Sequence, residues 1–393
     1  MHILLIPSWY PLNTNDIQGV FFREQARQLA KSNIQTGVIS PHLISLKKVL
    51  ANKETLGFNF TCDDGVNTYR YVGYDIFPRI SSLQRVTWLY FGIKLFKKYI
   101  KEFGKPDIIH AHCMLNGGVL AKNIYELYKI PYLITEHGSG YARGHFGKKQ
   151  ISLSREAAEK ASERLAVSQP LASDLTRLLG SNLSWKVMPN MLDEIFVKEN
   201  SQNITKSRKP FTYFGLAALT KHKSLDLLIK SFSKIAEQCP DCTVRIGGDG
   251  PERKYLEGLA KKLNIQDRIS FLGKLTRQQV LEEMNNANTF ILTSNFETFA
   301  VVAIEALSCG TPVITTKCGG PESIIRENFG IQVPLQDVES LSKAMLQIKD
   351  NYHEYDPELI RSECLAQYSG ENIANQLLEI YSNIVRPLTG TGS

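Results

Sequence analysis

The chain has 393 residues, of which 43% are hydrophobic and 22% are charged, as in a folded globular protein. These proportions exclude a disordered, collagen-like or coiled-coil chain. The length is roughly two to three times that of a common domain, which favours two domains. The longest apolar runs fall short of the about 18 residues that a membrane-spanning helix requires, so we expect no transmembrane segment.

The net charge of +7 is distributed unevenly. Residues 1–200 contain 25 Lys and Arg against 17 Asp and Glu, whereas residues 201–393 contain 21 against 22. A basic N-terminal half fits nucleic acid, an anionic membrane or an acidic substrate as partner, and charge alone does not choose among them. Seven scattered cysteines and a first segment unlike a signal peptide favour a cytoplasmic location.

Short apolar runs rich in β-branched residues predict six strands in each half of the chain. In the first half they cover residues 2–6, 34–40, 107–111, 131–135, 164–168 and 185–189. In the second half they cover residues 211–216, 243–247, 269–272, 289–293, 312–315 and 330–333. Helical stretches separate the second set, near 224–238, 251–264, 276–287, 300–309 and 321–327. Such alternation predicts parallel α/β sheets.

We therefore expect two doubly wound, Rossmann-like domains, one over residues 1–200 and one over residues 208–368. The polar, aperiodic residues 198–209 suit a linker between them. A last amphipathic helix, over residues 371–385, has one apolar stripe and is expected to pack back on the N-terminal domain.

Two common nucleotide-binding motifs are absent from the sequence. No G-x-G-x-x-G turn follows the first strand, and the glycine turn at 247–250 lacks a third glycine and continues with Pro251. No G-x4-G-K-[ST] run occurs either. These absences argue against a dinucleotide enzyme and a P-loop enzyme.

The segment 293–312 predicts a strand exit, a polar turn and a short helix that begins near Phe299. The unpaired amides of Phe299, Ala300 and Val301 would form an anion site at its start. Glu297 precedes this start, and Glu305 lies about 9 Å further along at about 1.5 Å per residue. This layout suits a diphosphate with a sugar on one side and a ribose on the other, because carboxylates accept hydrogen bonds from sugar hydroxyls. A capping Glu and a solvated Glu on a surface helix are the structural alternative.

The second half resembles the C-terminal domain of retaining, nucleotide-sugar-dependent glycosyltransferases of GT-B fold, family 4. The similarity rests on ETFAVVAIEALSCGTPVITTKCGGPESII, with Glu297 and Glu305 eight residues apart, FLGKL at 271–275, IGGDGPE at 246–252 and KSLDLLIKSF at 223–232. The first half is similar through DIIHAH at 107–112, PYLITEHGSG at 131–140, AVSQPLASDL at 166–175 and VMPNMLD at 187–193. The resemblance implies two Rossmann-like domains that face each other across a cleft.

The resemblance also implies residue roles. Lys223 would neutralise the leaving diphosphate, Glu297 would face hydroxyls of the donor sugar, and His137 would lie near the reacting carbon. The implied donor-binding residues are Glu305 at the ribose, Phe299, Ala300 and Val301 at the diphosphate, Lys274 and Leu275 at the nucleobase, Gly19 in an early loop, and Gly248 in the glycine turn.

Other polar residues are interpreted as structural. His110 and His112 are interpreted as structural or acceptor-side. Asp63 and Asp64 lie in a turn and differ from the Asp-x-Asp metal motif of the other main glycosyltransferase fold, so we expect no essential metal and no cofactor. The pair Cys239 and Cys242 is interpreted as part of an ordinary loop.

Two positions depart from the family pattern. Ala218 stands where an arginine usually pairs with the lysine on the diphosphate, and Lys221 or His222 would have to substitute for it. Met191 stands where a glycine usually follows Pro-Asn.

A basic amphipathic helix is predicted from Arg85 to Lys105. Its apolar positions are Leu89, Ile93, Phe96, Ile100 and Phe103, and its basic stripe contains Lys94, Lys97, Lys98, Lys101 and Lys105. The stripe suits peripheral contact with an anionic membrane, and a core helix with a solvated face is the alternative. Aromatic and basic residues do not interleave as in RNA-binding modules, so nucleic acid is not expected.

The expected activity is transfer of a sugar from a nucleotide diphosphate sugar to a glycan or lipid-linked acceptor, in polysaccharide or lipopolysaccharide biosynthesis. A nucleotide-sugar epimerase, a sugar phosphorylase and an inactive glycan- or nucleotide-sugar-binding protein remain the alternatives. Base, sugar and linkage are not encoded in these motifs.

Overall fold

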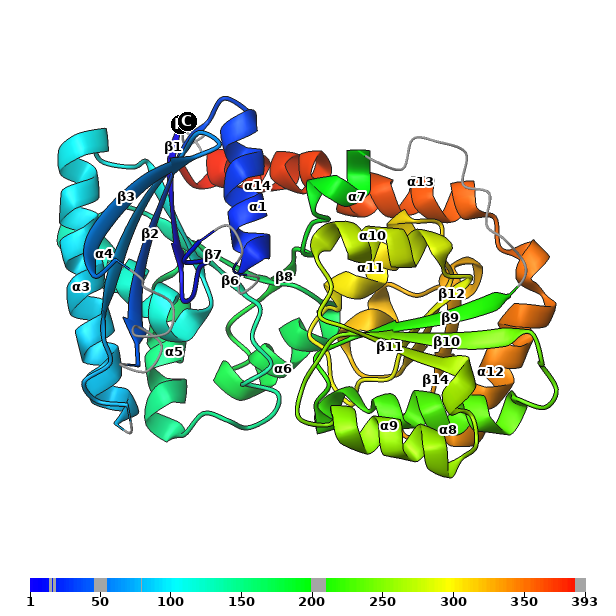
Figure 1. Cartoon of the computed structure of the whole chain (residues 1–393). Coiled ribbons are helices and arrows are strands. Elements are labelled where there is room, and N and C mark those ends of the chain that lie inside the picture. The colour runs from blue at the N-terminus through cyan, green and yellow to red at the C-terminus, as the bar shows by residue number, and fades with distance from the viewer. Residues whose placement is uncertain (14–15, 17–18, 46–54, 79, 199–209, 386–393) are drawn as a thin grey trace. The chain divides into compact units, whose positions relative to one another are not determined.

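A computed structural model describes residues 1–13, 16, 19–45, 55–78, 80–198 and 210–385. The chain divides into two compact units (Figure 1). Unit 1 comprises Met1–Pro189 and Gly370–Ser393, and unit 2 comprises Asn190–Ser369.

The boundary differs from the one expected at residue 200, because residues 190–198 belong to unit 2. The amide of Leu192 donates to the carbonyl of Tyr368 at 2.8 Å. Arg361 donates to the carbonyl oxygens of Phe196 and Val197 at 3.2 and 2.9 Å. These bonds attach the segment to unit 2. The expected linker lies, apart from residue 198, outside the described residues.

Unit 1 is built on an eight-stranded sheet in the order β3-β4-β2-β1-β5-β6-β7-β8. Its strands are β1 His2–Pro7, β2 Gln35–Ile44, β3 Gly57–Asp63, β4 Val66–Tyr74, β5 Ile108–His112, β6 Tyr132–Glu136, β7 Glu163–Ala166 and β8 Lys186–Val187. Neighbouring strands are parallel except β3 and β4, which form an antiparallel hairpin around Asp64 and Gly65. The sequence did not predict this hairpin, because most side chains of β3 are exposed and leave a weak apolar signal.

The helices of unit 1 are α1 Val20–Lys31, α3 Ser81–Phe103, α4 Val119–Tyr128, α5 Lys148–Lys160, α6 Gln169–Leu179 and α14 Gly370–Val385. Helices α3 and α4 lie on one face of the sheet, and α1 and α14 on the other (Figure 1). The last helix, α14, packs against β5, where the Tyr381 hydroxyl and His110 Nδ1 are 2.6 Å apart. Its apolar stripe is thereby buried in unit 1.

Unit 2 contains a parallel six-stranded sheet in the order β11-β10-β9-β12-β13-β14. The strands are β9 Phe211–Leu216, β10 Cys242–Gly247, β11 Ile269–Gly273, β12 Thr289–Leu292, β13 Val313–Thr316 and β14 Gly330–Val333. Because the chain proceeds outward from β9 first in one direction and then in the other, the carboxyl ends of β9 and β12 form the topological switch point. Sheets of this kind bind ligands there.

The helices of unit 2 are α7 Glu194–Lys198, α8 Leu225–Ile235, α9 Arg253–Lys262, α10 Arg277–Asn286, α11 Val301–Ser308, α12 Val338–Asp350 and α13 Pro357–Tyr368. Helix α8 contacts both α9 and α12, and α11 contacts both α10 and α13. These two groups of three helices cover opposite faces of the sheet (Figure 1). The unit is therefore a doubly wound, three-layer α/β fold.

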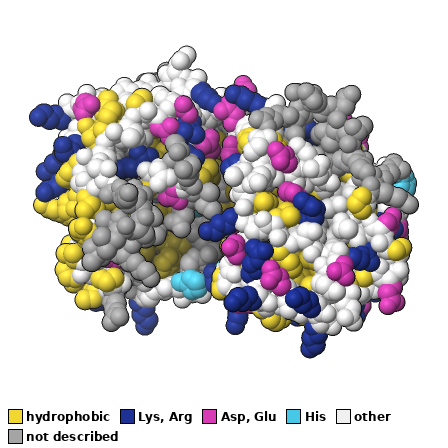
Figure 2. Space-filling view, viewed as in Figure 1, with side chains coloured by type: hydrophobic (Ala, Val, Ile, Leu, Met, Phe, Trp, Pro, Cys, Tyr) yellow, Lys and Arg dark blue, Asp and Glu magenta, His cyan; other side chains and the backbone are white. Residues whose placement is uncertain are grey.

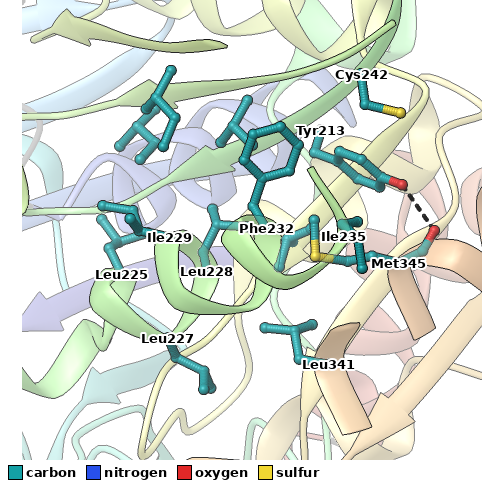
Figure 3. Close-up of a cluster of buried hydrophobic side chains, with 14 of the residues drawn as sticks. Tyr213, Leu225, Leu227, Leu228, Ile229, Phe232, Ile235, Cys242, Leu341 and Met345 are labelled. Atoms are coloured by element: carbon teal, nitrogen blue, oxygen red, sulfur yellow. Dashed lines mark hydrogen bonds between the residues drawn. The ribbon is translucent and has the colours of Figure 1, made fainter. Parts of the chain in front are cut away.

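A core of buried apolar side chains lies between the sheet and the layer of α8 and α12. Leu228, Ile229 and Phe232 of α8 are fully buried there (Figure 3). The Tyr213 hydroxyl on β9 donates to the carbonyl of Met345 on α12 at 2.8 Å (Figure 3). This packing fixes the strand and helix on either side of the loop that carries Lys223.

The expected helix at 321–327 is wrong. The structure has two short 3-10 turns instead, Gly320–Ser323 and Glu327–Phe329. Pro321 in the first turn has no amide to donate, and Gly330 ends the second turn at φ +146°. Helices α12 and α13 were not predicted, although Asp337 and Asp356 cap them through side-chain bonds that the sequence could have signalled.

Candidate active site

Lys223 and Glu297 meet at the switch point of unit 2. Lys223 ends a 3-10 turn after β9, and Glu297 lies in the loop after β12. Lys223 Nζ donates to Glu297 Oε1 at 2.5 Å, and the Ser294 hydroxyl donates to the same oxygen at 2.6 Å. The two side chains are 22% and 16% exposed, so the pair is shielded but reachable. The structure thus brings together two residues that the sequence placed 74 positions apart.

The start of α11 lies four residues after Glu297. The helix begins at Val301 and not near Phe299, because Ala300 adopts a left-handed conformation with φ +72°. The amides of Phe299, Ala300 and Val301 donate to no backbone acceptor among the described residues. The chain also passes close to Gly320, where a Cβ would come within 2.4 Å of the Phe299 nitrogen. The predicted row of unpaired amides is therefore present in an altered backbone geometry.

Glu305 is a buried carboxylate on α11, only 2% exposed. Its Oε1 accepts a bond from Arg277 Nη2 at 2.6 Å, and its Oε2 has no hydrogen-bond partner among the described residues. Arg277 Nε also donates to Asp193 Oδ2 at 3.1 Å. Burial lowers the pKa of Arg277, but the two carboxylates outweigh this and raise it above its ordinary value. Sequence analysis missed Arg277 and did not assign a role to Asp193.

The loops after β9, β10 and β11 approach one another closely. Gly248, with φ +113°, would place a Cβ 1.8 Å from the Ala217 carbonyl oxygen, and its amide donates to the carbonyl of Gly273 at 2.7 Å. Leu275 follows this contact and lies against Gly247, while Lys274 is exposed. Only glycine fits at position 248, which accounts for its place in the motif.

Ala218 is exposed in the loop that leads to Lys223. Lys221 lines a different cavity, of about 690 Å³, with residues that include Ser224, Tyr255 and Asn295. His222 Nδ1 lies 3.1 Å from the Thr220 hydroxyl. It is Lys223, the next residue along the chain, whose Nζ pairs with Glu297.

In unit 1, the predicted residues Gly19 and His137 are connected through Phe22. Gly19 caps α1 with φ +78°, and a Cβ there would lie 3.2 Å from Phe22. The His137 ring is 5.0 Å from the ring of Phe22, and His137 Nε2 lies 3.1 Å from His112 Nδ1. His137 is 8% exposed.

Glu136 organises the loop that carries His137. This buried carboxylate accepts bonds from the amides of Met114, His137 and Gly138 at 2.9, 3.0 and 2.7 Å. Burial raises the pKa of Glu136, and these amide bonds oppose the rise. Glu136 was not singled out from the sequence, where its contact with Met114, 22 residues away, leaves no signal.

His110 and His112 are fully buried side chains of β5. His110 contacts Tyr381 and the Thr135 hydroxyl through its two ring nitrogens, the latter at 2.7 Å. Burial lowers the pKa of His110 to about 3 and that of His112 well below its ordinary value, so both rings are neutral. His110 therefore has a structural role, while His112 supports His137.

The helix predicted from Arg85 to Lys105 is α3, which ends at Phe103, so Lys105 lies beyond it. Lys94, Lys97, Lys98 and Lys101 are exposed, as expected. The N-terminal half of α3 also exposes Leu83, Val86 and Tyr90, by 40%, 62% and 54%. Figure 2 shows hydrophobic and basic side chains next to one another at the left edge of the view, over α3.

The described part of the chain contains neither a membrane-spanning helix nor a metal-binding cluster of acidic, Cys or His side chains. None of its helices combines the length and the apolar character that crossing a bilayer demands. No group of three His, Cys, Asp or Glu side chains in the same residues is placed to hold a metal ion. Cys239 and Cys242 are free and buried; Cys239 lies in the loop before β10, and Cys242 is the first residue of that strand.

Comparison with known proteins assigns most of the chain to two family models. Residues 196–361 match glycosyl transferases group 1, and residues 18–194 match glycosyltransferase family 4. The chain is 27% identical over 290 residues to N-acetyl-alpha-D-glucosaminyl L-malate synthase from Bacillus anthracis, covering 71% of this chain and 75% of that protein.

Solved structures share the fold. Sucrose-phosphate synthase from Thermosynechococcus elongatus superposes with a TM-score of 0.77 at 19% identity, covering 98% of this chain and 99% of the other. Anabaena HepE in complex with UDP superposes with a TM-score of 0.73 at 18% identity, covering 98% and 100%. Both units therefore have the architecture of GT-B glycosyltransferases.

Proposed function

This chain belongs to the group 1 glycosyltransferases of family 4, and we propose that it moves a sugar from a nucleotide diphosphate sugar to a glycan or lipid-linked acceptor with retention of anomeric configuration. The observation that carries the proposal is the ion pair of Lys223 and Glu297 beside the unpaired amides that precede α11.

The donor diphosphate binds at this pair. The amides of Phe299, Ala300 and Val301 hydrogen-bond its oxygens, and the ammonium of Lys223 neutralises the charge that grows on the β-phosphate as the sugar departs. Lys223 is held at 2.5 Å by Glu297, so it is oriented before the donor arrives. A fixed cation here replaces a divalent ion, and the reaction proceeds in the presence of a chelator.

Glu305 binds the ribose. Its Oε2 is buried without a partner among the described residues, whereas its Oε1 is fixed by Arg277. A buried carboxylate oxygen that lacks a donor is costly, and a ribose hydroxyl supplies one. Lys274 and Leu275 lie beside the nucleobase, at the close approach formed around Gly248.

The sugar–phosphate bond breaks heterolytically, and the acceptor oxygen bonds to the anomeric carbon on the face that the phosphate leaves. The acceptor proton passes to the departing phosphate oxygen, so no side-chain base is required. Glu297 contacts hydroxyls of the transferred sugar, and His137, oriented by His112 and Glu136, lies on the N-terminal side of the reacting carbon.

The acceptor belongs to the assembly of a cell-surface polysaccharide or lipopolysaccharide. Exposed lysines and the exposed Leu83, Val86 and Tyr90 of α3 give unit 1 a surface suited to an anionic bilayer, with roughly 1 kcal/mol of attraction per lysine. Vesicles with phosphatidylglycerol should sediment the protein, and vesicles of phosphatidylcholine alone should not. Equal sedimentation would contradict this part of the proposal.

Turnover of UDP- and GDP-sugars in EDTA, followed by NMR, tests the proposed reaction. One donor should be consumed, with slow hydrolysis in place of transfer when no acceptor is present, and the product should keep the anomeric configuration. Lys223→Ala and Glu297→Gln should each lower turnover by about 10²–10³, the usual loss on removing one transition-state contact. Lys234→Ala, which breaks the exposed pair with Glu339 in the same unit, is the control. Unchanged turnover in Lys223→Ala and Glu297→Gln would refute the assignment.

A further inference from the structure

Unit 1 contains a cavity of about 440 Å³ that is separate from the residues around His137. It lies where β1 and β2 end and α3 begins, since Ser8, His42 and Ser81 are among its lining residues. The carboxyl ends of neighbouring parallel strands are where α/β sheets bind ligands. The position of the cavity is therefore that of a ligand site.

The lining of this cavity suits a sugar ring. Trp9 and Trp88 contribute flat apolar surfaces, and Gln84, Asn116 and Gln150 contribute amide groups that both donate and accept. Aromatic faces with a few polar groups are the usual lining of small-molecule sites.

Arg85 adds a positive charge to the lining. The side chain as a whole is only half-buried, but its Nε is buried and has no hydrogen-bond partner among the described residues. Partial burial lowers the pKa of Arg85. A buried N–H that lacks an acceptor is costly, and a phosphate or carboxylate oxygen supplies one.

The lining also contains the ionisable groups of Tyr10, Asp16 and His42. Asp16 accepts a bond from the amide of Leu12 at 3.3 Å. His42 lies 3.1 Å from the Ser40 hydroxyl, and burial lowers its pKa to about 3. Among the described lining residues, Arg85 is the one with a guanidinium or ammonium group, so it is the cation that this cavity presents to a ligand.

We propose that this cavity binds the acceptor, and that the acceptor sugar carries a phosphate or a carboxylate that pairs with Arg85. The proposal rests on the proposed function for the existence of an acceptor. Because α3 exposes Leu83 and Val86 next to the lining residues Gln84 and Arg85, a lipid-linked phosphate would place its sugar in the cavity and its lipid outward. An acidic sugar of a soluble glycan has the same ionic chemistry.

Tryptophan fluorescence can test this proposal without any donor. The chain has three tryptophans, of which Trp9 and Trp88 line the cavity. In a Trp185→Phe background, glucose 6-phosphate and glucuronic acid should each change the emission in a saturable way. Neutral methyl glucoside should bind about ten- to hundredfold more weakly, the range of one charge-assisted hydrogen bond. A sugar linked to a lipid phosphate, presented in vesicles, distinguishes the two kinds of acceptor. It should bind more tightly than both soluble probes if the natural acceptor is lipid-linked, and no more tightly if the natural acceptor is a soluble glycan.

Three variants test whether Arg85 causes the preference for anionic probes. Arg85→Gln should remove the preference for anionic probes, Arg85→Lys should retain part of it, and Arg177→Gln, on the exposed surface of α6, should leave it unchanged. Equal affinity for anionic and neutral probes, or an unchanged preference in Arg85→Gln, would overturn the proposal. Nucleotide affinity of the wild-type chain is measured separately by calorimetry. If no nucleotide binds while the anionic preference persists, the proposed function fails and the anion site stands.

Discussion

Replacement of Arg277 by Met tests the network that holds Glu305. Arg277 bridges Glu305 and Asp193, at 2.6 and 3.1 Å, and Glu305 is 2% exposed. Without the guanidinium, both oxygens of the buried Glu305 carboxylate lack a partner. Breaking a buried pair costs about 3–5 kcal/mol, and we expect about 3 kcal/mol because the Arg277 side chain is 36% exposed. A unit of this size then loses about 6–12 °C in melting temperature.

Urea unfolding of four chains measures the effect. These are the wild type, Arg277→Met, Glu305→Gln and the double variant. The double variant should be more stable than Arg277→Met, because the neutral amide is less costly to bury than the carboxylate. Arg253→Met is the matched control: Arg253 is 34% exposed, much like Arg277, but its partner Glu257 is 41% exposed where Glu305 is 2%, so this pair should contribute less than about 1 kcal/mol. The network would have no structural role if Arg277→Met lost no more stability than Arg253→Met. The same conclusion would follow if the double variant were no more stable than Arg277→Met.

Three further outcomes follow from other contacts. The pKa of His110 is about 3 in the folded chain against 6.5 ordinarily, so its contribution to stability is complete above pH 6.5 and decreases below it, by up to about 1.4 kcal/mol per pH unit. The urea midpoint of His110→Gln should therefore depend less on pH than that of the wild type, and an equal dependence would contradict this. Phe232→Ala should lower the free energy of unfolding by about 3–5 kcal/mol, since Phe232 is fully buried, and a loss below about 1 kcal/mol would show that the core collapses around the gap. Ala218→Arg should tighten UDP or GDP binding by about tenfold in calorimetry, because Ala218 is exposed in the Lys223 loop; weaker binding would show that this loop cannot direct a guanidinium toward the phosphates.

The parallel sheet of unit 2 could be predicted because its central strands β9, β12 and β13 are buried on both faces and appear as short apolar runs. Strand β9 was predicted at Phe211–Leu216, where the structure has it. The hairpin of β3 and β4 could not be predicted in this way, because β3 is exposed along most of its length. Helix boundaries near Ala300 were shifted by two residues, since a left-handed alanine has no sequence signal.

The candidate site was predictable where a motif encodes it and not where it depends on tertiary contacts. Glu297 and Lys223 were named separately, and only the folded chain brings them to 2.5 Å. Arg277 and Asp193 were missed, because their importance comes from contact with Glu305, 28 residues from Arg277 along the chain. Arg85 was named only as the start of the predicted amphipathic helix, whereas its side chain lines a cavity.

The central claim is that unit 2 binds a nucleoside diphosphate through Lys223 and the amides before α11 without a metal ion. Calorimetric titration of UDP and GDP in EDTA measures this directly. We expect saturable binding of one of them, weakened by about tenfold or more in Lys223→Ala and unchanged in Lys234→Ala. If neither nucleotide bound in EDTA, or if Lys223→Ala bound as tightly as the wild type, the claim would be contradicted.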